Sequence, residues 1–366
     1  MVDFSRWHSI PPYSLGKEEK FEMLSVALKE LTVHHEMQCE PYRNILSASS
    51  FSAASAKSYL EIPFLPVRLF KELELLSVQP EEVFKTMTSS GTSGQSVSRI
   101  YLDKITAANQ TKALTHIVAD FIGDKRMPMI VIDSPNVIKD RSLFSARGAG
   151  ILGFSIFAKD RIFGLDEEMG LDVSGVNAFL EKHNGKQMLL FGFTYMVWQH
   201  LYKELARTGS TLDLSNSVLI HGGGWKKLVD EKVESSEFRK KLNDVSGLAR
   251  VHDYYGMVEQ TGSVYLECER GHLHTSIYSD VVTRRGVDFE PANFGEVGVI
   301  EVVSILPTSY PGHVLLTEDE GIILGEDDCT CGRLGKYFRI VGRIKNAEPR
   351  GCSDTYNSMP LIVGQK

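Results

Sequence analysis

A short segment rich in hydroxyl groups and glycine, residues 88–94, is the strongest chemical signal in this sequence. Five of its seven residues carry a hydroxyl and the other two are glycine. Hydroxyls donate hydrogen bonds to phosphate oxygens, and glycine lets the backbone turn its amides toward an anion. No Gly-Lys-Ser/Thr follows, so the segment is not a Walker loop. Two interpretations stay open: a phosphate-binding loop, or a flexible surface loop of ordinary composition.

A carboxylate lies just beyond a second glycine turn, in the stretch that runs from Tyr254 to Gly262. Glu259, placed there, is suited to holding a magnesium ion against nucleotide phosphates. The plainer interpretation is a solvated glutamate.

Three consecutive glycines, Gly222, Gly223 and Gly224, follow a short apolar run and precede Trp225 and Lys226. Such a triplet lets the backbone approach a flat ligand closely. The alternative is an ordinary tight turn.

Cysteine and histidine gather in two places with the spacing of metal ligands. Cys329 and Cys331 form a C-x-C pair, while Cys268 is followed by His272 and His274. Three thiolates and one imidazole make a tetrahedral zinc site, and four protein ligands leave no open position, so the predicted role is structural. The alternative is three unrelated cysteines, because C-x-C is shorter than the usual zinc spacing.

The elements that must position these groups change in type along the chain. Helices are predicted over residues 14–32, 67–75 and 107–121 from apolar residues at helical spacing. From about Met127 the pattern is strand, glycine turn, helix, strand, which predicts an α/β fold with a doubly wound sheet. Its strands are expected at 129–133, 188–191 and 217–220, with a helix at 195–206. From Gly295 onward the chain is β-rich, with strands expected at 297–304, 314–317 and 337–341.

Composition excludes several classes of protein. The 366 residues include 40 basic and 47 acidic side chains, a net charge of −7, which argues against a nucleic-acid or anionic-membrane surface. No apolar run approaches the ~20 residues of a membrane helix, and the start lacks a secretory signal. Five widely spread cysteines do not form a disulfide framework. We therefore expect a soluble, cytoplasmic protein.

In this order, the segments resemble the motifs of the adenylate-forming enzymes. Residues 88–94 resemble their phosphate loop, residues 255–259 their Tyr-Gly-x-x-Glu motif, and residues 317–319 with 342–343 their ribose-binding Asp and hinge-side Arg. The match is best to the acyl-protein synthetases of bacterial luminescence operons, the LuxE-like family. These share the Ser-Ser-Gly-Thr loop, the Gly-Gly-Gly-Trp-Lys segment and a Gly-Cys dipeptide matching Gly351 and Cys352. The resemblance covers roughly residues 63–352.

The resemblance implies a two-step reaction in which a carboxylic acid, expected to be a long-chain fatty acid, reacts with ATP to give an acyl-adenylate, and a thiol then takes the acyl group. The implied cofactors are ATP and Mg²⁺, with Glu259 as the magnesium ligand. The residues implied to hold phosphate are Thr88, Ser89, Ser90, Gly91, Thr92 and Gly94. Asp319 and Arg343 would hold the ribose, and the adenine and acyl pocket would be shaped by Gly222, Gly223, Gly224, Tyr255 and Gly256. The lysine that often ends the phosphate loop is missing, and Arg99 and Lys104 are alternatives for its charge.

The same resemblance implies the large N-terminal domain of that fold, doubly wound sheets with a small β-rich subdomain. We expect a mainly helical part at 1–85, a nucleotide- and acyl-binding core at 86–290, a β-rich subdomain at 291–343 and a tail at 344–366. The tail is too short for the mobile C-terminal domain of most such enzymes, so no domain swing is expected to deliver coenzyme A. A related arrangement of cysteines and histidine in the phenylacetate-ligase-like branch favours His274 over His272 as the fourth zinc ligand.

Cys352 is the expected acyl acceptor. Pro349 and Gly351 favour an extended backbone around it, and Arg350 would lower the pKa of its thiol by favouring the anion. At ~3.3–3.6 Å per residue, the nine residues from Arg343 to Cys352 reach at most about 30 Å, enough to visit the nucleotide site. The alternative is an incidental thiol.

Two enzyme functions therefore stay open. One is an acyl-protein synthetase that hands the acyl group from Cys352 to a partner, an acyl reductase or another acyl-transfer or carrier protein. The other is an adenylating ligase that transfers it to coenzyme A or a carrier-protein thiol. A binding role without ATP chemistry is a third, disfavoured by the intact order of motifs.

Overall fold

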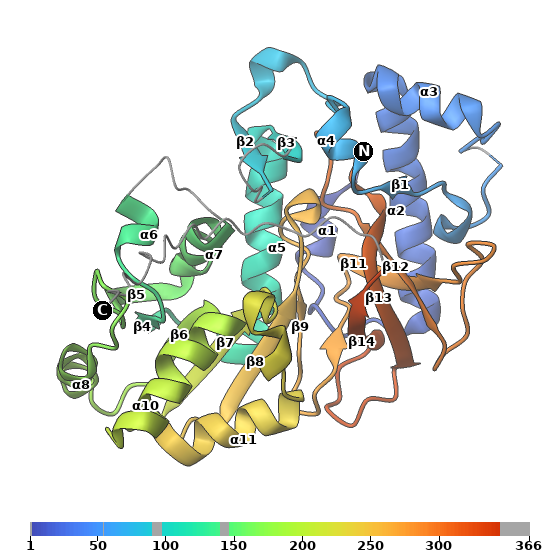
Figure 1. The fold of residues 1–366 in the computed structure, drawn as a ribbon. Coiled ribbons are helices and arrows are strands. Elements are labelled where there is room, and N and C mark those ends of the chain that lie inside the picture. Colours follow the sequence, from blue (N-terminus) through green and yellow to red (C-terminus); the bar gives the residue numbers. More distant parts are fainter. Residues whose placement is uncertain (1, 54, 90–96, 140–145, 345–366) are drawn as a thin grey trace, which may run out of the picture.

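Two six-stranded sheets organise the chain, one on each side of helix α5 (Lys104–Ile122) (Figure 1). The computed structural model describes residues 2–53, 55–89, 97–139 and 146–344. Helix α5 begins where the Asp103 side chain accepts a hydrogen bond of 2.7 Å from the Thr106 amide, and it ends before Gly123. Its Thr106 hydroxyl lies 2.6 Å from that of Thr308, in a connection between two strands of one sheet, and its Phe121 ring packs edge-on against His252 in a strand of the other.

The first sheet is parallel except at one edge, with the strand order β5-β4-β6-β7-β8-β9. Strands β4, β6 and β7 are buried along their whole length, which explains their unbroken apolar runs. The bounds are β4 Met127–Val131, β5 Ala158–Phe163, β6 Met188–Phe193, β7 Ser217–Gly222, β8 Arg250–Tyr255 and β9 Tyr265–Leu266. The glycine triplet and Tyr255 thus lie at the carboxyl ends of neighbouring parallel strands, where open α/β sheets bind ligands.

The second sheet is antiparallel in the order β10-β14-β13-β12-β11, and a short strand β1 pairs parallel with β13. Its strands are β1 Leu65–Pro66, β10 Leu273–His274, β11 Ser279–Arg284, β12 Val297–Ser304, β13 Val314–Glu326 and β14 Lys336–Arg343. Strands β1, β10 and β11 precede residue 291, the predicted start of the β-rich subdomain, and β12, β13 and β14 follow it. Strand β13 runs nine residues past the predicted end at Thr317, because Asp319 and Glu320 pair with Arg343 and Gly342 of β14.

A small hairpin and several helices complete the fold. The hairpin joins β2 (Lys85–Thr88) to β3 (Arg99–Leu102). The α-helices are α1 Phe4–Trp7, α2 Lys17–Gln38, α3 Glu40–Ala48, α4 Leu69–Glu72, α6 Asn136–Lys139, α7 Ala146–Phe154, α8 Val173–Lys182, α9 Thr194–Met196, α10 Lys203–Thr208 and α11 Ser235–Ser246. The predicted helix at 195–206 is continuous from α9 to α10 through a π-helical stretch, Val197–Tyr202. Within the described residues, the 3₁₀ turns are Tyr59–Glu61, Pro80–Glu82, Ser155–Phe157, Lys226–Glu231 and Val258–Gln260.

Among the described helices, none combines the length and the apolar character that crossing a bilayer demands.

Candidate nucleotide site and cysteine–histidine cluster

The hairpin β2–β3 holds the two ends of the predicted phosphate loop together. Thr88 is paired with Arg99 across the hairpin, and the Ser89 amide donates to the Ser98 carbonyl at 3.1 Å. The Ser98 amide returns a hydrogen bond of 2.9 Å to the Ser89 hydroxyl. The loop between these ends includes Ser90, Gly91, Thr92 and Gly94, which lie outside the described residues. Ser89 and Ser98 thus lie on a hairpin whose second strand, β3, is followed directly by α5.

Glu259 lies in a 3₁₀ turn that follows β8, and the residue is 5% exposed. The turn closes at Gly262, whose φ is +90° and whose α-carbon faces the backbone of α5. A Cβ at this position would lie 2.7 Å from the Gln110 carbonyl oxygen, so only glycine fits without displacement. Close contact with α5 thus explains why a glycine stands at position 262, three residues after Glu259.

The glycine triplet follows β7 as predicted, and it brings aromatic rings against the backbone. A Cβ at Gly222 would lie 2.6 Å from the Tyr254 ring, and one at Gly223 would lie 2.4 Å from the Phe193 ring. Gly223 and Gly224 both have positive φ. Beside them, burial lowers the pKa of His221 to about 3, so this imidazole is neutral near pH 7. The triplet therefore lies directly against aromatic rings at the carboxyl end of β7.

Tyr255, Asp319 and Arg343, predicted from three separate motifs, meet in space. The Tyr255 phenol donates a hydrogen bond of 2.8 Å to Asp319 Oδ2, and Arg343 Nε lies 3.4 Å from Asp319 Oδ1. Arg343 also forms an ion pair of 2.5 Å with Glu318. The sequence did not indicate a role for Glu318, although its place beside Asp319 in the Thr-Glu-Asp motif was the available signal.

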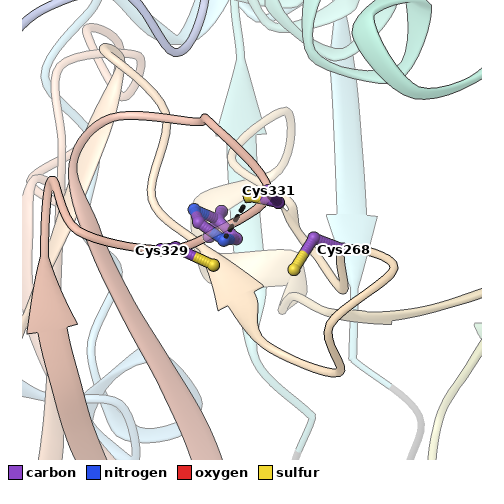
Figure 2. Close-up of side chains that lie close together, drawn as sticks. Cys268, Cys329 and Cys331 are labelled. Atoms are coloured by element: carbon purple, nitrogen blue, oxygen red, sulfur yellow. Dashed lines mark hydrogen bonds between the residues drawn. The ribbon is translucent and has the colours of Figure 1, made fainter.

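The predicted cysteines and one of the two predicted histidines form a single cluster (Figure 2). The ligand atoms of Cys268, His274, Cys329 and Cys331 all lie within 4.8 Å of one another. Cys268 lies in the β9–β10 connection and His274 in strand β10, while Cys329 and Cys331 lie in the turn between β13 and β14.

Two similar turns present the sulfurs. Each has the sequence Cys-x-x-Gly: the Gly271 amide donates to the Cys268 carbonyl at 2.9 Å, and the Gly332 amide to the Cys329 carbonyl at 3.0 Å. Both glycines have positive φ, +83° and +85°. The amide of Arg270 points at Cys268 Sγ, 3.4 Å away, as that of Arg333 points at Cys331 Sγ, 3.5 Å away. Amides directed at sulfur favour the thiolate form that binds metal.

The two candidate histidines differ in burial. His274 is fully buried and its Nε2 lies 3.4 Å from Cys331 Sγ. His272 is partly exposed, and its Nδ1 lies 3.3 Å from Cys329 Sγ. Burial lowers the pKa of His274 to about 4 and raises that of Cys268 to about 12. Burial therefore favours the neutral form of both the imidazole and the thiol.

The model of the acyl-protein synthetase family LuxE matches residues 7–359. This chain belongs to that family. Membership confirms the predicted activity, acyl-protein synthesis by an acid–thiol ligase. Two curated relatives, both named long-chain-fatty-acid–luciferin-component ligase, are similar over nearly the whole chain. The one from Vibrio harveyi is 23% identical over 352 residues, covering 93% of this chain and 89% of its own length. The one from Aliivibrio fischeri is 24% identical over 361 residues, covering 93% and 90%.

Solved structures of adenylate-forming ligases share the fold of this family member. A 2-hydroxyisobutyryl-CoA ligase in an open conformation, in complex with 2-HIB-AMP and CoA, superposes with a TM-score of 0.68 at 15% identity, covering 91% of this chain and 77% of the ligase. The same ligase in its thioesterification state gives a TM-score of 0.70 at 14% identity, covering 92% and 70%. The predicted fold, the large domain of the adenylate-forming enzymes, is confirmed.

Proposed function

We propose that this chain activates a long-chain fatty acid with ATP and passes the acyl group through its own Cys352 to a partner protein. The observation that carries the proposal is the meeting of Tyr255, Asp319 and Arg343 beside the carboxyl ends of the parallel strands. Both curated relatives are named as ligases of long-chain fatty acids, which supports the same substrate here.

In the first step a carboxylate oxygen of the fatty acid attacks the α-phosphorus of ATP, and pyrophosphate leaves with its electron pair. Charge builds up on the phosphorus oxygens, and preorganised donors stabilise it. Thr88, Ser89 and the loop beyond them would supply hydroxyl and amide donors. Asp319, held by Tyr255, would accept hydrogen bonds from the ribose hydroxyls.

Glu259 would hold a magnesium ion, and its buried carboxylate fits the oxygen ligands that this cation prefers. The ion would neutralise negative charge on the phosphates. The protein's part is to keep the carboxylate in place in the turn that follows β8.

In the second step the Cys352 thiolate attacks the acyl carbonyl carbon, a thioester forms, and AMP leaves. Cys352 lies outside the described residues, so this part rests on the Gly-Cys match and on the reach of the chain from Arg343. The expected recipient is an acyl reductase or another acyl-transfer protein in the cytoplasm. The second candidate, transfer to coenzyme A or a carrier-protein thiol, differs only in the thiol.

We further propose that Cys268, His274, Cys329 and Cys331 bind one structural Zn²⁺. Three sulfurs and one imidazole nitrogen within 4.8 Å of one another fit a tetrahedral ion, and the two Cys-x-x-Gly turns support the sulfurs. The ion would join the β9–β10 connection to the turn that links β13 and β14, the strands that carry Asp319 and Arg343.

The test of the acyl route uses the full chain with a radiolabelled long-chain fatty acid, ATP and Mg²⁺, followed by a denaturing gel. We expect label on the 40.9 kDa band, removed by neutral hydroxylamine as a thioester is. Cys352→Ser should lose this label yet still release pyrophosphate, while Cys39→Ala, a change at a buried cysteine, should keep both. Undiminished label on Cys352→Ser would exclude Cys352 as the acceptor.

A further inference from the structure

The main chain of Glu259 is held by a buried phenol. The Tyr310 hydroxyl donates a hydrogen bond of 3.0 Å to the Glu259 carbonyl oxygen, and the Tyr310 side chain is fully buried. The same hydroxyl accepts a hydrogen bond of 3.3 Å from Gln110 Nε2 of α5. A phenol has one hydrogen to donate, so both of its roles here are defined.

The segment around Tyr310 also contacts the turn of Glu259 through Gln260 and through Gly312. Gln260, the next residue, donates through Nε2 to the Gly312 carbonyl at 2.9 Å and to the Val302 carbonyl at 3.1 Å. A Cβ on Gly312 would lie 2.8 Å from the Glu259 carbonyl oxygen, so the two backbones are in close contact. On the opposite side, Gly262 rests on the backbone of Gln110. The turn is therefore clamped between α5 and the β12–β13 connection.

We propose that Tyr310 is a positioning residue for the metal-binding carboxylate of Glu259. It touches neither ATP nor metal in this proposal; it fixes the backbone from which the carboxylate extends. The inference rests on the proposed role of Glu259. Loss of the phenol oxygen leaves a buried carbonyl without its donor and frees the turn to shift, and a carboxylate displaced from its working geometry binds a cation less well.

A purely structural role predicts something different, and a second buried tyrosine separates the two. Tyr278 is also fully buried, and its hydroxyl also has two partners, His8 Nδ1 at 2.9 Å and His116 Nδ1 at 2.7 Å. It too is tied to α5, but it has no hydrogen bond to the Glu259 turn. Tyr278→Phe therefore matches Tyr310→Phe in chemistry and in burial, without touching the carboxylate.

The experiment measures fatty-acid-dependent pyrophosphate release by the full chain over a range of Mg²⁺ concentrations, with the melting temperature of each variant. We expect Tyr310→Phe to raise the half-saturating Mg²⁺ concentration roughly tenfold, because the free energy of one buried hydrogen bond corresponds to about this factor in a binding constant. The KM for fatty acid should be unchanged. Tyr278→Phe should keep the wild-type Mg²⁺ curve even though its melting temperature falls. Gln110→Leu, which removes the donor to the phenol, should shift the curve in the same direction by a smaller factor.

A wild-type Mg²⁺ curve for Tyr310→Phe overturns the inference. If Tyr310→Phe does not fold, Gln110→Leu decides in its place, and an unshifted curve for that variant has the same meaning. Failure of the underlying function looks different. No pyrophosphate release by wild type with any fatty acid rejects the proposed activity and the inference with it. A Glu259→Gln variant with the wild-type Mg²⁺ dependence rejects the metal role of Glu259.

Discussion

The phenol of Tyr255 donates a 2.8 Å hydrogen bond to the carboxylate of Asp319, although 64 residues separate them in the chain. The first residue ends a strand of the parallel sheet and the second lies within a strand of the antiparallel sheet. This bond therefore spans the junction of the two sheets. It also occupies one carboxylate oxygen, Oδ2, and leaves Oδ1 on the side of Arg343.

Removing the Tyr255 hydroxyl should weaken ATP binding without abolishing the reaction. Tyr255→Phe is expected to raise the KM for ATP about fivefold to tenfold, because the carboxylate loses one of its fixed partners. Steady-state pyrophosphate release against ATP concentration measures this. Glu320→Gln is the control, since its side chain extends from the opposite face of β13 to that of Asp319. An unchanged KM in Tyr255→Phe would show that the bond plays no part in nucleotide binding.

Zinc should be present at about one ion per chain in the purified protein, by elemental analysis, if the four ligands act as proposed. Cys329→Ser should lose the ion and lower the melting temperature by roughly 5–10 °C, because a structural zinc contributes directly to folding. Zinc-free protein that melts like the zinc-loaded protein would rule out the structural role.

The two histidines of the cluster make different predictions. His274→Gln should lose the zinc, because its imidazole is the one grouped with all three sulfurs. His272→Gln should retain about one ion per chain, since its ring is partly exposed. The reverse pattern would assign the fourth ligand to His272.

Stability should fall in mild acid because of a buried histidine pair. The rings of His35 and His313 are 4.9 Å apart, and burial holds the pKa of His35 well below its usual range and lowers that of His313 to about 3. In the unfolded chain both take up a proton near pH 6.5. The folded form is therefore favoured fully above about pH 6.5, and stability is lost as the pH falls from there toward 3, by at most about 1.4 kcal/mol per pH unit for each group.

Urea unfolding between pH 8 and pH 5 tests this prediction. His313→Gln should flatten the pH dependence of the free energy of unfolding. His34→Gln, a change at a less buried histidine on the same helix, should alter it much less, because burial is a larger cause of both lowered pKa values than the charge of His34. An equal slope in wild type and His313→Gln would contradict the prediction.

Local patterns predicted those parts of the molecule that depend on local chemistry. Strands β4, β6 and β7 of the parallel sheet were predicted because burial on both faces requires unbroken apolar runs, whereas β5 and β8 contain charged residues and were not predicted. The cysteine–histidine cluster was predicted because the spacing of its residues is short within each turn. Strand β13 was predicted too short because Glu318, Asp319 and Glu320 interrupt its apolar pattern, and only pairing with β14 keeps them in a strand. The hydrogen bonds that hold the Glu259 turn could not be predicted either, because they too join residues from distant parts of the chain. Gln110, Tyr310 and Glu259 are far apart in sequence, and a lone buried tyrosine has no pattern of its own.

The pairing of β1 with β13 has a consequence for the order in which the molecule is made. Leu65 lies opposite Leu315, so a strand translated early stays without its partner until 250 further residues have been added. The turn with Cys329 and Cys331 follows, and Arg343 comes later still. A ribosome must therefore release nearly all of the described chain before the antiparallel sheet can close, whereas the parallel strands β4 to β8 are complete by residue 255. Assembly of the nucleotide site is thus a late event in biosynthesis, and a product truncated ahead of β14 would contain every strand of the parallel sheet but lack Arg343 of the nucleotide site.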